Sequence, residues 1–306
     1  MERPLRRRLR GYLAVMGAAA LWGISGVVAK ALFNRRIEPW TLVEIRLSGS
    51  FLVLLLILVL RRVPLRVPRR QLATLVLLGL AMSAAQFSYY LAISLTDVST
   101  AIFLQYTAAV FVVLYAWFVE REPLTVLKAA AILLAIGGSY LLVTGGSGIR
   151  ISPLGLTAGI LSAAAFGVYA LLGRGRVREL GSWTVLLYTL GTGAVAWSLI
   201  VPPWRAYRGS YAGAEWSLFA FIIIFATILP FGLFLHGLRT ISPSLASLTA
   251  TLEPVVASAA AFLLLNEALG SAQIAGGAAI AAGVALIPVS DLLTARRETL
   301  MPPAPD

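Results

Sequence analysis

Residues 242–287 read SPSLASLTATLEPVVASAAAFLLLNEALGSAQIAGGAAIAAGVALI and decide the fold of the whole chain. Two long apolar segments flank the polar pair Asn266-Glu267. A helix crosses the hydrocarbon core of a bilayer, roughly 30 Å thick, in about 20 residues, which is the length of each segment. The stretch therefore predicts two consecutive membrane-spanning helices.

Glu253 lies near the middle of the first segment and is followed at once by Pro254. A carboxylate near the bilayer midplane is costly, and a proline there removes a backbone hydrogen-bond donor. An ionisable side chain at that depth is a candidate for substrate contact or proton coupling, provided that it faces protein or water. The alternative is structural, because a protonated Glu253 would bond the backbone groups that Pro254 leaves without partners.

The same pattern occurs earlier in the chain, over residues 94–142. A shift of 145 positions aligns four pairs of identical residues: Ser99 with Ser244, Ala101 with Ala246, Glu122 with Glu267, and Gly138 with Gly283. The order of these matches predicts an internal repeat. The copies differ at the carboxylate, since Ala108-Ala109 stands where Glu253-Pro254 stands in the second copy. Any role of Glu253 is therefore asymmetric.

The composition excludes an ordinary soluble protein and several classes of chemistry. Of the 306 residues, 59% are hydrophobic and only 12% are charged, which is typical of a polytopic membrane protein. The chain has no cysteine and one histidine, so thiolate chemistry and a multi-histidine metal site are excluded. The net charge of +12 comes from arginines in short loops beside apolar segments, which indicates contact with lipid and not with nucleic acid.

The hydropathy pattern predicts an all-α polytopic membrane protein with ten transmembrane helices. The predicted spans are 11–33, 41–60, 71–93, 98–119, 125–144, 153–173, 182–200, 216–238, 244–265 and 271–289. Five spans in each repeat, an odd number, require the second repeat to enter the membrane upside down relative to the first. Inverted repeats of this kind are typical of secondary transporters and enclose a central cavity near the midplane. We therefore expect a basic N-terminal segment (1–10), two five-helix repeats (11–144 and 153–289) with the densest packing inside each repeat, and a C-terminal tail (290–306).

The distribution of lysine and arginine sets the expected orientation. With the N-terminus inside, eighteen of the twenty-five Lys and Arg residues fall in cytoplasmic segments and six in outer ones, while Arg46 falls within a span. The sequence therefore predicts a multi-pass protein of the bacterial inner membrane with both termini cytoplasmic. Its expected partners are a small-molecule solute and the lipid bilayer, not nucleic acid, and a monomer is one possible assembly.

Three segments carry a resemblance to a known family: ALWGISGVVAKAL near the N-terminus, FVEREPLTVLKAAAILLAIGGSYLL in the first repeat, and TLEPVVASAAAFLLLNEALGSAQIAGGAAIAAGVALI in the second. With them, residues 11–289 resemble the EamA-type branch of the drug/metabolite transporter superfamily. The resemblance implies a ten-helix exporter of amino acids and other small metabolites, with a central cavity that opens alternately to either side. It does not fix the substrate.

Polar and aromatic side chains at helical spacing mark helix faces that differ from a lipid-exposed face. Together they predict an aromatic-rich cavity with few polar groups, as is usual for a small-molecule site. The candidate substrate-binding residues are Trp22, Ser25, Gln86, Tyr90, Gln105, Tyr106, Phe166, Tyr169, Thr249 and Glu253. The two glutamines have the alternative role of bonding a neighbouring helix.

Other charged or titratable residues each have two interpretations. Lys30, Glu44 and Arg46 lie near the outer ends of the first two spans, where they either pair with one another or extend to the interface. Arg46 is then not expected deep in the membrane, which leaves Glu253 as the only deeply placed charge. His236, at the inner end of the eighth span, is an interfacial residue or a second candidate for proton coupling.

The leading interpretation is a secondary transporter, an exporter of small organic metabolites such as amino acids, including aromatic or other apolar ones. A catalytic role is not expected, because the sequence contains no HExxH motif, no cysteine nucleophile and no paired carboxylates on one span. The lack of a GxxxxGK[ST] loop excludes direct use of ATP, and no cofactor or metal is predicted. The alternatives are a channel, a membrane scaffold, or a carrier for another solute class such as nucleotide sugars or drugs.

The predicted topology is testable with reporter fusions. The loops 145–152 and 202–216 are expected to report an outer location, because the excess of Lys and Arg places both termini inside. A cytoplasmic signal from either loop would overturn the ten-span arrangement and the inverted repeat with it.

Overall fold

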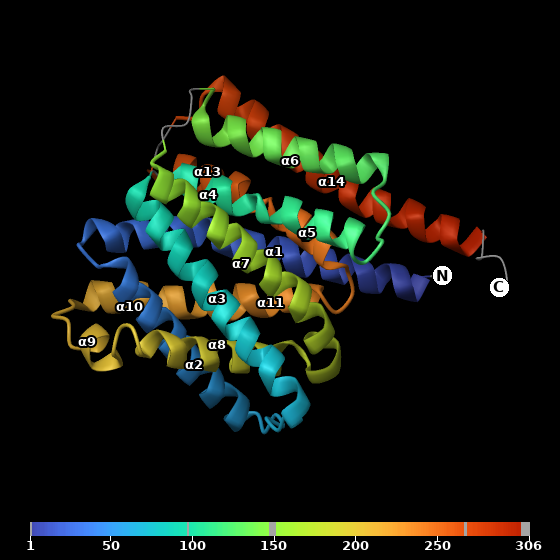
Figure 1. The fold of residues 1–306 in the computed structure, drawn as a ribbon. Helices are drawn as coiled ribbons and strands as arrows, with labels where there is room; N and C mark the ends of the chain where they lie inside the picture. Colours follow the sequence, from blue (N-terminus) through green and yellow to red (C-terminus); the bar gives the residue numbers. More distant parts are fainter. Residues whose placement is uncertain (1, 97, 147–150, 266–267, 301–306) are drawn as a thin grey trace.

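The computed structural model describes residues 2–96, 98–146, 151–265 and 268–300, and within these ranges the chain is helical and contains no strand (Figure 1). The helices are, in chain order, α1 (Glu2–Asn34), α2 (Pro39–Leu60), α3 (Arg69–Leu95), α4 (Val98–Tyr106), α5 (Ala108–Phe118), α6 (Val126–Thr144), α7 (Pro153–Leu180), α8 (Ser182–Ser198), α9 (Pro203–Tyr207), α10 (Gly213–Ile223), the π-helical segment η1 (Ile224–Ile228), α11 (Leu229–Gly237), α12 (Pro243–Ala250), α13 (Glu253–Leu265) and α14 (Ser271–Leu300). Every predicted span therefore coincides with helical structure.

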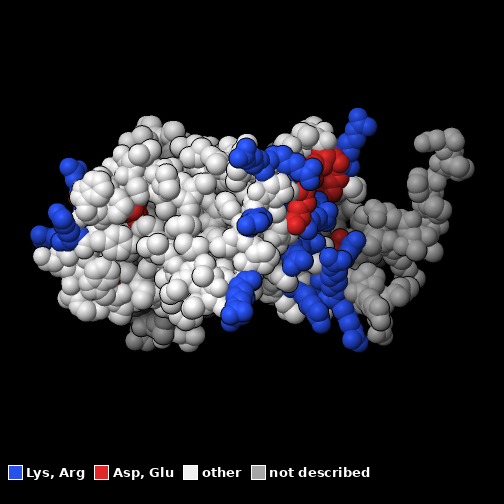
Figure 2. Space-filling view, turned by 90° about the horizontal axis from the view of Figure 1, so that it is seen from below, with Lys and Arg blue, Asp and Glu red and all other residues white. Residues whose placement is uncertain are grey.

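The surface and the helix lengths fit a membrane protein. Figure 2 shows a broad uncharged band between two ends that carry the Lys and Arg side chains. Eight helical stretches of the described chain are long and apolar enough to cross a bilayer. The other two predicted spans correspond to α8, which has 17 residues, and to α12 with α13, which are separated by a turn.

Two of the predicted spans are interrupted near their middles. α4 and α5 replace the span 98–119 and meet at Thr107, whereas α12 and α13 replace the span 244–265 and meet at residues 251–252. The interruptions therefore lie at nearly equivalent positions of the two sequence copies. At the first, the Thr107 hydroxyl donates to the Leu104 carbonyl at 2.6 Å, where it competes with the regular helical donor.

The second interruption follows from Pro254. Proline has no N–H to donate to the carbonyl of Ala250, four residues earlier, so regular α-helical bonding ends there. The turn before it uses a tighter bond, from the Thr251 N–H to the Leu248 carbonyl at 3.2 Å. Thr251 is fully buried, so this irregular backbone is covered by protein and not exposed to lipid.

The predicted span 216–238 is a third irregular helix. α10 passes into η1, and α11 continues from it with Pro230 as its second residue. Pro230 cannot donate to the Ala226 carbonyl. The Thr227 hydroxyl donates to the Ile222 carbonyl at 2.8 Å, five residues earlier. A π-helical segment of this kind leaves carbonyl groups open to partners from other helices.

The two halves of the chain interlock. α1 packs against α11, α12 and α13, and α7 packs against α3, α4 and α5. α6 and α14 lie side by side along one edge of the molecule (Figure 1). The expectation that packing is densest within each half is therefore wrong. Its physical reason is that these helices turn faces of small residues toward the other half, where the backbones approach most closely.

Glycines make these close approaches. A Cβ atom on Gly23 of α1 would lie 2.7 Å from the carbonyl oxygen of Glu253 in α13. A Cβ atom on Gly138 of α6 would lie 2.6 Å from the Gly276 carbonyl of α14, and one on Gly276 would lie 2.5 Å from the Gly138 carbonyl. Because these distances are too short for real side chains, any substitution there forces the two helices apart.

Gly276→Ala is expected to lower the melting temperature of the detergent-purified protein, because the added methyl group meets the α6 backbone. Overpacking of this kind costs about 1–3 kcal/mol. Gly277→Ala is the matched control, since a Cβ there would meet only Leu142 Cδ1 at 3.8 Å, an ordinary contact. Thermal unfolding followed by tryptophan fluorescence provides the measurement. Equal melting temperatures for the two variants would contradict the close α6–α14 contact.

Candidate functional site

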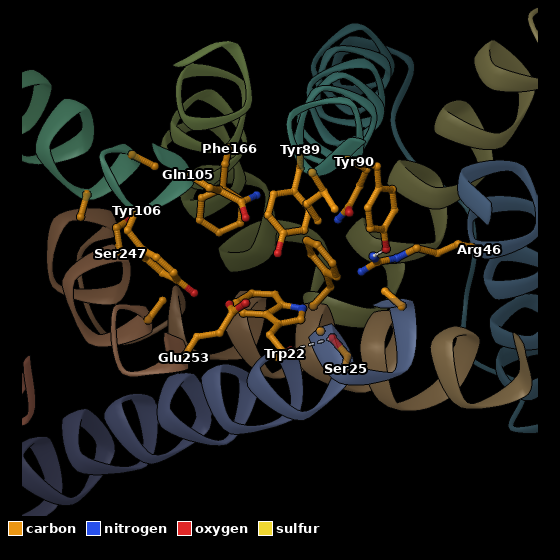
Figure 3. A pocket seen from close by; sticks show the side chains of 18 of the residues that line it. Trp22, Ser25, Arg46, Tyr89, Tyr90, Gln105, Tyr106, Phe166, Ser247 and Glu253 are labelled. Carbon is orange, nitrogen blue, oxygen red and sulfur yellow. Dashed lines mark hydrogen bonds between the residues drawn. The ribbon is translucent and has the colours of Figure 1, made fainter. Parts of the chain in front are cut away.

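A cavity lies at the centre of the helix bundle (Figure 3). The volume within it that the centre of a water molecule can reach is about 70 Å³. Its walls come from α1, α2, α3, α4, α5, α7, α11, α12 and α13, so both halves of the chain build it. The lining residues are Trp22, Ser25, Gly26, Ala29, Phe33, Arg46, Gln86, Tyr89, Tyr90, Ile93, Gln105, Tyr106, Ala108, Ala109, Phe166, Phe231, Ser247, Ala250 and Glu253.

Glu253, the first residue of α13, lies at one end of the cavity (Figure 3). The hydroxyl of Tyr106, the last residue of α4, points toward its carboxyl group. Tyr106 and Ser247 both carry buried hydroxyls that have no hydrogen-bond partner among the described residues. The two interrupted helices thus bring a carboxyl group and two unpaired hydroxyls to the same side of the cavity.

Arg46 of α2 lies at the opposite end of the cavity and is only 5% exposed (Figure 3). Its guanidinium donates three hydrogen bonds, from Nε to the Thr227 hydroxyl (2.8 Å), from Nη1 to the Tyr90 hydroxyl (2.6 Å) and from Nη2 to the Ala226 carbonyl (2.7 Å). Its central carbon lies 5.9 Å from the ring centres of Tyr90 and Phe231, within the range of cation–π attraction. No carboxylate of the described chain forms an ion pair with it.

The irregular helix formed by α10, η1 and α11 explains how an arginine is held at this depth. Pro230 leaves the Ala226 carbonyl without its α-helical donor, and the Arg46 Nη2 group supplies one. The π-helical segment also presents the Thr227 hydroxyl to the Nε group. Arg46 follows Pro39, the first residue of α2, by seven positions, or about 10 Å along the helix axis. It is therefore well inside the span.

Aromatic rings form the walls between the two charged ends. The Trp22 ring contacts the rings of Phe166 and Phe231, with centroids 6.1 and 5.0 Å away. Figure 3 shows Trp22 and Tyr89 between the glutamate and the arginine, with Phe166 above Glu253. Rings of this kind supply apolar contact area, and those of Tyr and Trp also carry a polar group.

The cavity contains more polar groups than protein partners for them. Gln86 and Gln105 line it and form no hydrogen bond with the described residues. Buried polar groups in proteins are nearly always hydrogen-bonded, so this arrangement suits a small polar ligand with an apolar part. No group of three or more His, Asp or Glu residues that could hold a metal ion occurs in the part of the chain that the structure describes.

A second cavity lies at the end of the molecule where α1 begins and α14 ends, and charged and hydroxyl side chains line it. Glu122, between α5 and α6, pairs with Lys128 Nζ at 2.9 Å and accepts hydrogen bonds from Ser242 (3.0 Å) and Ser244 (2.7 Å). Burial raises the pKa of Glu122, but Lys128 and the two serines together lower that pKa below its usual value. These four residues, the Glu122 cluster, join the α5–α6 turn to the start of α12.

The family follows from two matching regions of the sequence. A model of the EamA-like transporter family matches residues 9–144 and, a second time, residues 153–288. The chain belongs to the EamA-like transporter family. The two matches also confirm that this EamA-like protein contains the family's repeat twice, as the alignment of its two halves predicts.

The EamA-like protein is similar to several transporters. It is 28% identical over 299 residues to the uncharacterized inner membrane transporter YicL of Salmonella typhimurium, covering 94% of this chain and 98% of that protein. It is 25% identical over 237 residues to the threonine/homoserine exporter RhtA of the same bacterium, covering 76% of each. A solved crystal structure shares its fold, with a TM-score of 0.77 and 21% identity over 94% of this chain and 98% of that one. The EamA-like protein is a multi-pass membrane transporter of the drug/metabolite type.

Most of the residues predicted to contact a substrate lie in the cavity. The eight that line it are Trp22, Ser25, Gln86, Tyr90, Gln105, Tyr106, Phe166 and Glu253. Tyr169 does not line it, because it is fully buried behind Phe166 and Phe231, with ring centroids 6.3 and 5.8 Å away. A step of three residues leaves Tyr169 only about 60° around α7 from Phe166, so the two rings are neighbours, with Phe166 and not Tyr169 in the cavity wall.

Thr249 and His236 also lie outside the cavity lining. The Thr249 hydroxyl donates to the Leu245 carbonyl of its own helix at 2.7 Å. In an unbroken helix Thr249 and Glu253 would share a face, but the turn between α12 and α13 changes the rotation and brings Ser247 to the cavity instead. His236 is exposed near the end of α11.

Arg46 is the charged cavity residue that the hydropathy pattern does not indicate. The prediction that Glu253 is the only deeply placed charge is wrong. Arg46 neither pairs with its predicted acidic neighbour near the outer end nor extends to the membrane interface. Glu44 accepts a hydrogen bond from the Ser198 hydroxyl at 3.1 Å and does not pair with Arg46, while the side chain of Lys30 lies outside the described part. The other lining residues missing from the predicted set include Phe33, Tyr89, Phe231 and Ser247.

The absence of native cysteine allows single cysteines to report on the cavity. Ser25→Cys is expected to react with a small methanethiosulfonate reagent in the purified protein, because Ser25 lines the cavity. Ser162→Cys is the matched control, since Ser162 is fully buried and donates to the Ala85 carbonyl at 2.9 Å. It is expected to react many-fold more slowly, because burial shields the thiol. Mass spectrometry measures the labelling rates. A rate at Ser25→Cys as slow as that at Ser162→Cys would mean that the reagent does not reach the cavity.

Proposed function

We propose that the EamA-like protein is a secondary transporter that exports small organic metabolites such as amino acids by alternating access. The observation that carries this proposal is the central cavity, whose walls come from both halves and in which the hydroxyls of Tyr106 and Ser247 have no hydrogen-bond partner among the described residues. The aromatic walls offer an apolar surface against which an apolar side chain can pack. The name of the relative RhtA, a threonine/homoserine exporter, supports both the solute class and the direction.

The proposed architecture has ten spans in two inverted five-helix repeats, residues 11–144 and 153–289. The nearly equivalent interruptions of α4–α5 and α12–α13 support it. So does the reciprocal packing, in which α1 lies against α11, α12 and α13 while α7 lies against α3, α4 and α5. In this arrangement α8 and the pair α12–α13 also cross the membrane.

The proposed orientation has both termini on the cytoplasmic side of a bacterial inner membrane. α1 begins and α14 ends at the same end of the molecule (Figure 1), and most of the Lys and Arg side chains visible in Figure 2 gather toward that end. Positive side chains favour the cytoplasmic side of a membrane. The name of the relative YicL supports an inner-membrane location.

This orientation gives the two cavities different roles in alternating access. The central cavity is lined by residues of the second half of α1 and the first part of α2, on the outer side of the proposed membrane. The Glu122 cluster closes the inner side by joining helices of both halves. The arrangement therefore suits an outward-facing state. Opening the inner side would separate Glu122 from Ser242 and Ser244.

Glu253 is the group proposed to couple protons to transport. Its carboxyl group lines the cavity and has the Tyr106 hydroxyl of α4 as its neighbour, so it is placed to contact a solute. His236, the other candidate, is exposed and lies outside the cavity lining, so its position gives it less support.

Transport by the purified protein in liposomes tests these proposals. We expect counterflow of at least one amino acid, because a carrier exchanges external for internal solute whereas a channel does not. Glu253→Gln is expected to abolish the response of transport to a pH gradient while counterflow persists, since the amide fills the same space but cannot titrate. Glu38→Gln, at a carboxylate before α2 that makes no side-chain cap, is the matched control and should change neither property.

The two parts of this experiment fail separately. Absence of counterflow for every amino acid tested would contradict the proposed amino acid carrier. An unchanged pH response in Glu253→Gln would remove Glu253 from energy coupling and leave the carrier in place.

A further inference from the structure

We propose that Arg46 and Glu253 form the two poles of a zwitterion site, in which Arg46 binds a carboxylate and Glu253 binds an ammonium group of the same small molecule. The class of ligand is an α-amino acid with an uncharged side chain. This inference rests on the proposed transport function and specifies which groups of the solute are recognised. It assigns to Arg46 a role in selecting the substrate.

The guanidinium of Arg46 is held in place but not saturated. Arginine has five N–H donors, and the three hydrogen bonds to Thr227, Tyr90 and Ala226 use one donor on each nitrogen. One N–H on each of Nη1 and Nη2 therefore stays available. A planar pair of N–H groups matches the two oxygens of a carboxylate, and such bidentate pairs are among the strong hydrogen bonds of proteins.

The charge of Arg46 lacks a counter-ion within the described protein. Its three acceptors are a carbonyl and two hydroxyls, all neutral, and the aromatic faces of Tyr90 and Phe231 offset the charge only in part. A buried charge is costly unless it is paired. Glu253, the acidic residue that lines the same cavity, forms no ion pair with Arg46. A ligand with both charges fills the gap and neutralises both ends.

The Glu253 end has the acceptors that an ammonium group needs. An ammonium carries three N–H donors and no acceptor. The carboxylate of Glu253 and the unpaired hydroxyl oxygens of Tyr106 and Ser247 lie on the same side of the cavity (Figure 3). Pro254 adds to this set, because it leaves the carbonyl of Ala250, another lining residue, without its α-helical donor.

The aromatic walls beside the two poles define the remainder of the ligand, because the carboxylate and the ammonium of an α-amino acid share one carbon and the side chain extends away from both. Trp22, Tyr89 and Phe166 line this part of the cavity (Figure 3). Their rings favour an apolar or aromatic side chain over a charged one, because no further charged residue lines the cavity within the described chain. The site thus fits a neutral amino acid better than a phosphorylated solute, which needs several basic side chains.

A ligand series tests the two poles in the wild-type protein. The assay is inhibition of amino acid counterflow in liposomes by L-phenylalanine, by its amide, which lacks the carboxylate, and by 3-phenylpropionate, which lacks the ammonium. L-Leucine and L-threonine with their amides extend the series. The free amino acids are expected to inhibit about 10- to 100-fold more strongly than the amides, the range of a charge-assisted hydrogen bond. An amide that inhibits as well as its amino acid would overturn the carboxylate role of Arg46.

Variants assign the discrimination to a residue. Arg46→Gln should remove most of the preference for the amino acid over its amide, whereas Glu253→Gln should weaken the preference over 3-phenylpropionate. Glu44→Gln is the matched control on the same helix, because Glu44 is fully buried and lies outside the cavity lining, and it should keep both preferences. If Arg46→Gln does not fold, Arg46→Lys keeps the charge but loses the fork, and a reduced preference is again expected.

The outcomes separate this inference from the proposed function. Two outcomes would contradict the zwitterion site and leave an amino acid carrier. One is saturable counterflow that amino acid and amide inhibit equally, and the other is an Arg46→Lys protein with the full wild-type preference. A lower melting temperature of the Arg46 variants with an unchanged preference for the amino acid over its amide would mean that Arg46 only stabilises the fold, which also contradicts the inference. Absence of all counterflow would instead contradict the proposed function.

Discussion

A backbone N–H or C=O group without a partner costs several kcal/mol in the hydrocarbon core of a membrane, and this constraint governs where the helices can break. The turn at Thr107, the turn at residues 251–252 and the segment η1 all lie where other helices cover them. Each interruption provides polar groups that a regular helix would use for its own hydrogen bonds. The first two bring unpaired groups to the cavity, and η1 provides the acceptors that hold Arg46. The cavity is therefore a consequence of where regular hydrogen bonding stops.

The positions of the helices could be predicted from the sequence because backbone polar groups in lipid have to form hydrogen bonds within their own segment, which only a helix allows here. An apolar run of about 20 residues has to form a helix in lipid, so all ten predicted spans coincide with helices. The partners of each helix could not be predicted. Small residues such as Gly23 and Gly138 indicate close packing, but lipid and protein are equally apolar, so hydrophobicity does not tell which neighbour a face prefers. The interlocked halves follow from shape, which a single sequence does not reveal.

The candidate site was predictable on most of the regular helices, although Tyr169 of the continuous helix α7 lies behind the cavity wall. Trp22, Gln86 and Tyr90 lie in the cavity as predicted, because residues at helical spacing stay on the same side of a helix that is not interrupted. The same reasoning fails at Thr249, whose helix turns before it reaches Glu253. It fails most clearly at Arg46. Its burial depends on groups 180 or more residues away in the chain, and those groups are available only because a proline and a π-helical segment open the helix that carries them.

The interlocking of the halves has a consequence for biosynthesis. The ribosome completes α3, α4 and α5 before it reaches α7, so α7 meets its partners as soon as it enters the membrane. For α1 the order is reversed, because it is inserted first and its partners α11, α12 and α13 are translated near the end of synthesis. Until then lipid has to cover the glycine face of α1 around Gly23. The first helix to enter the bilayer is therefore among the last to dock, and the N-terminal half reaches its final packing only after most of the C-terminal half has been made.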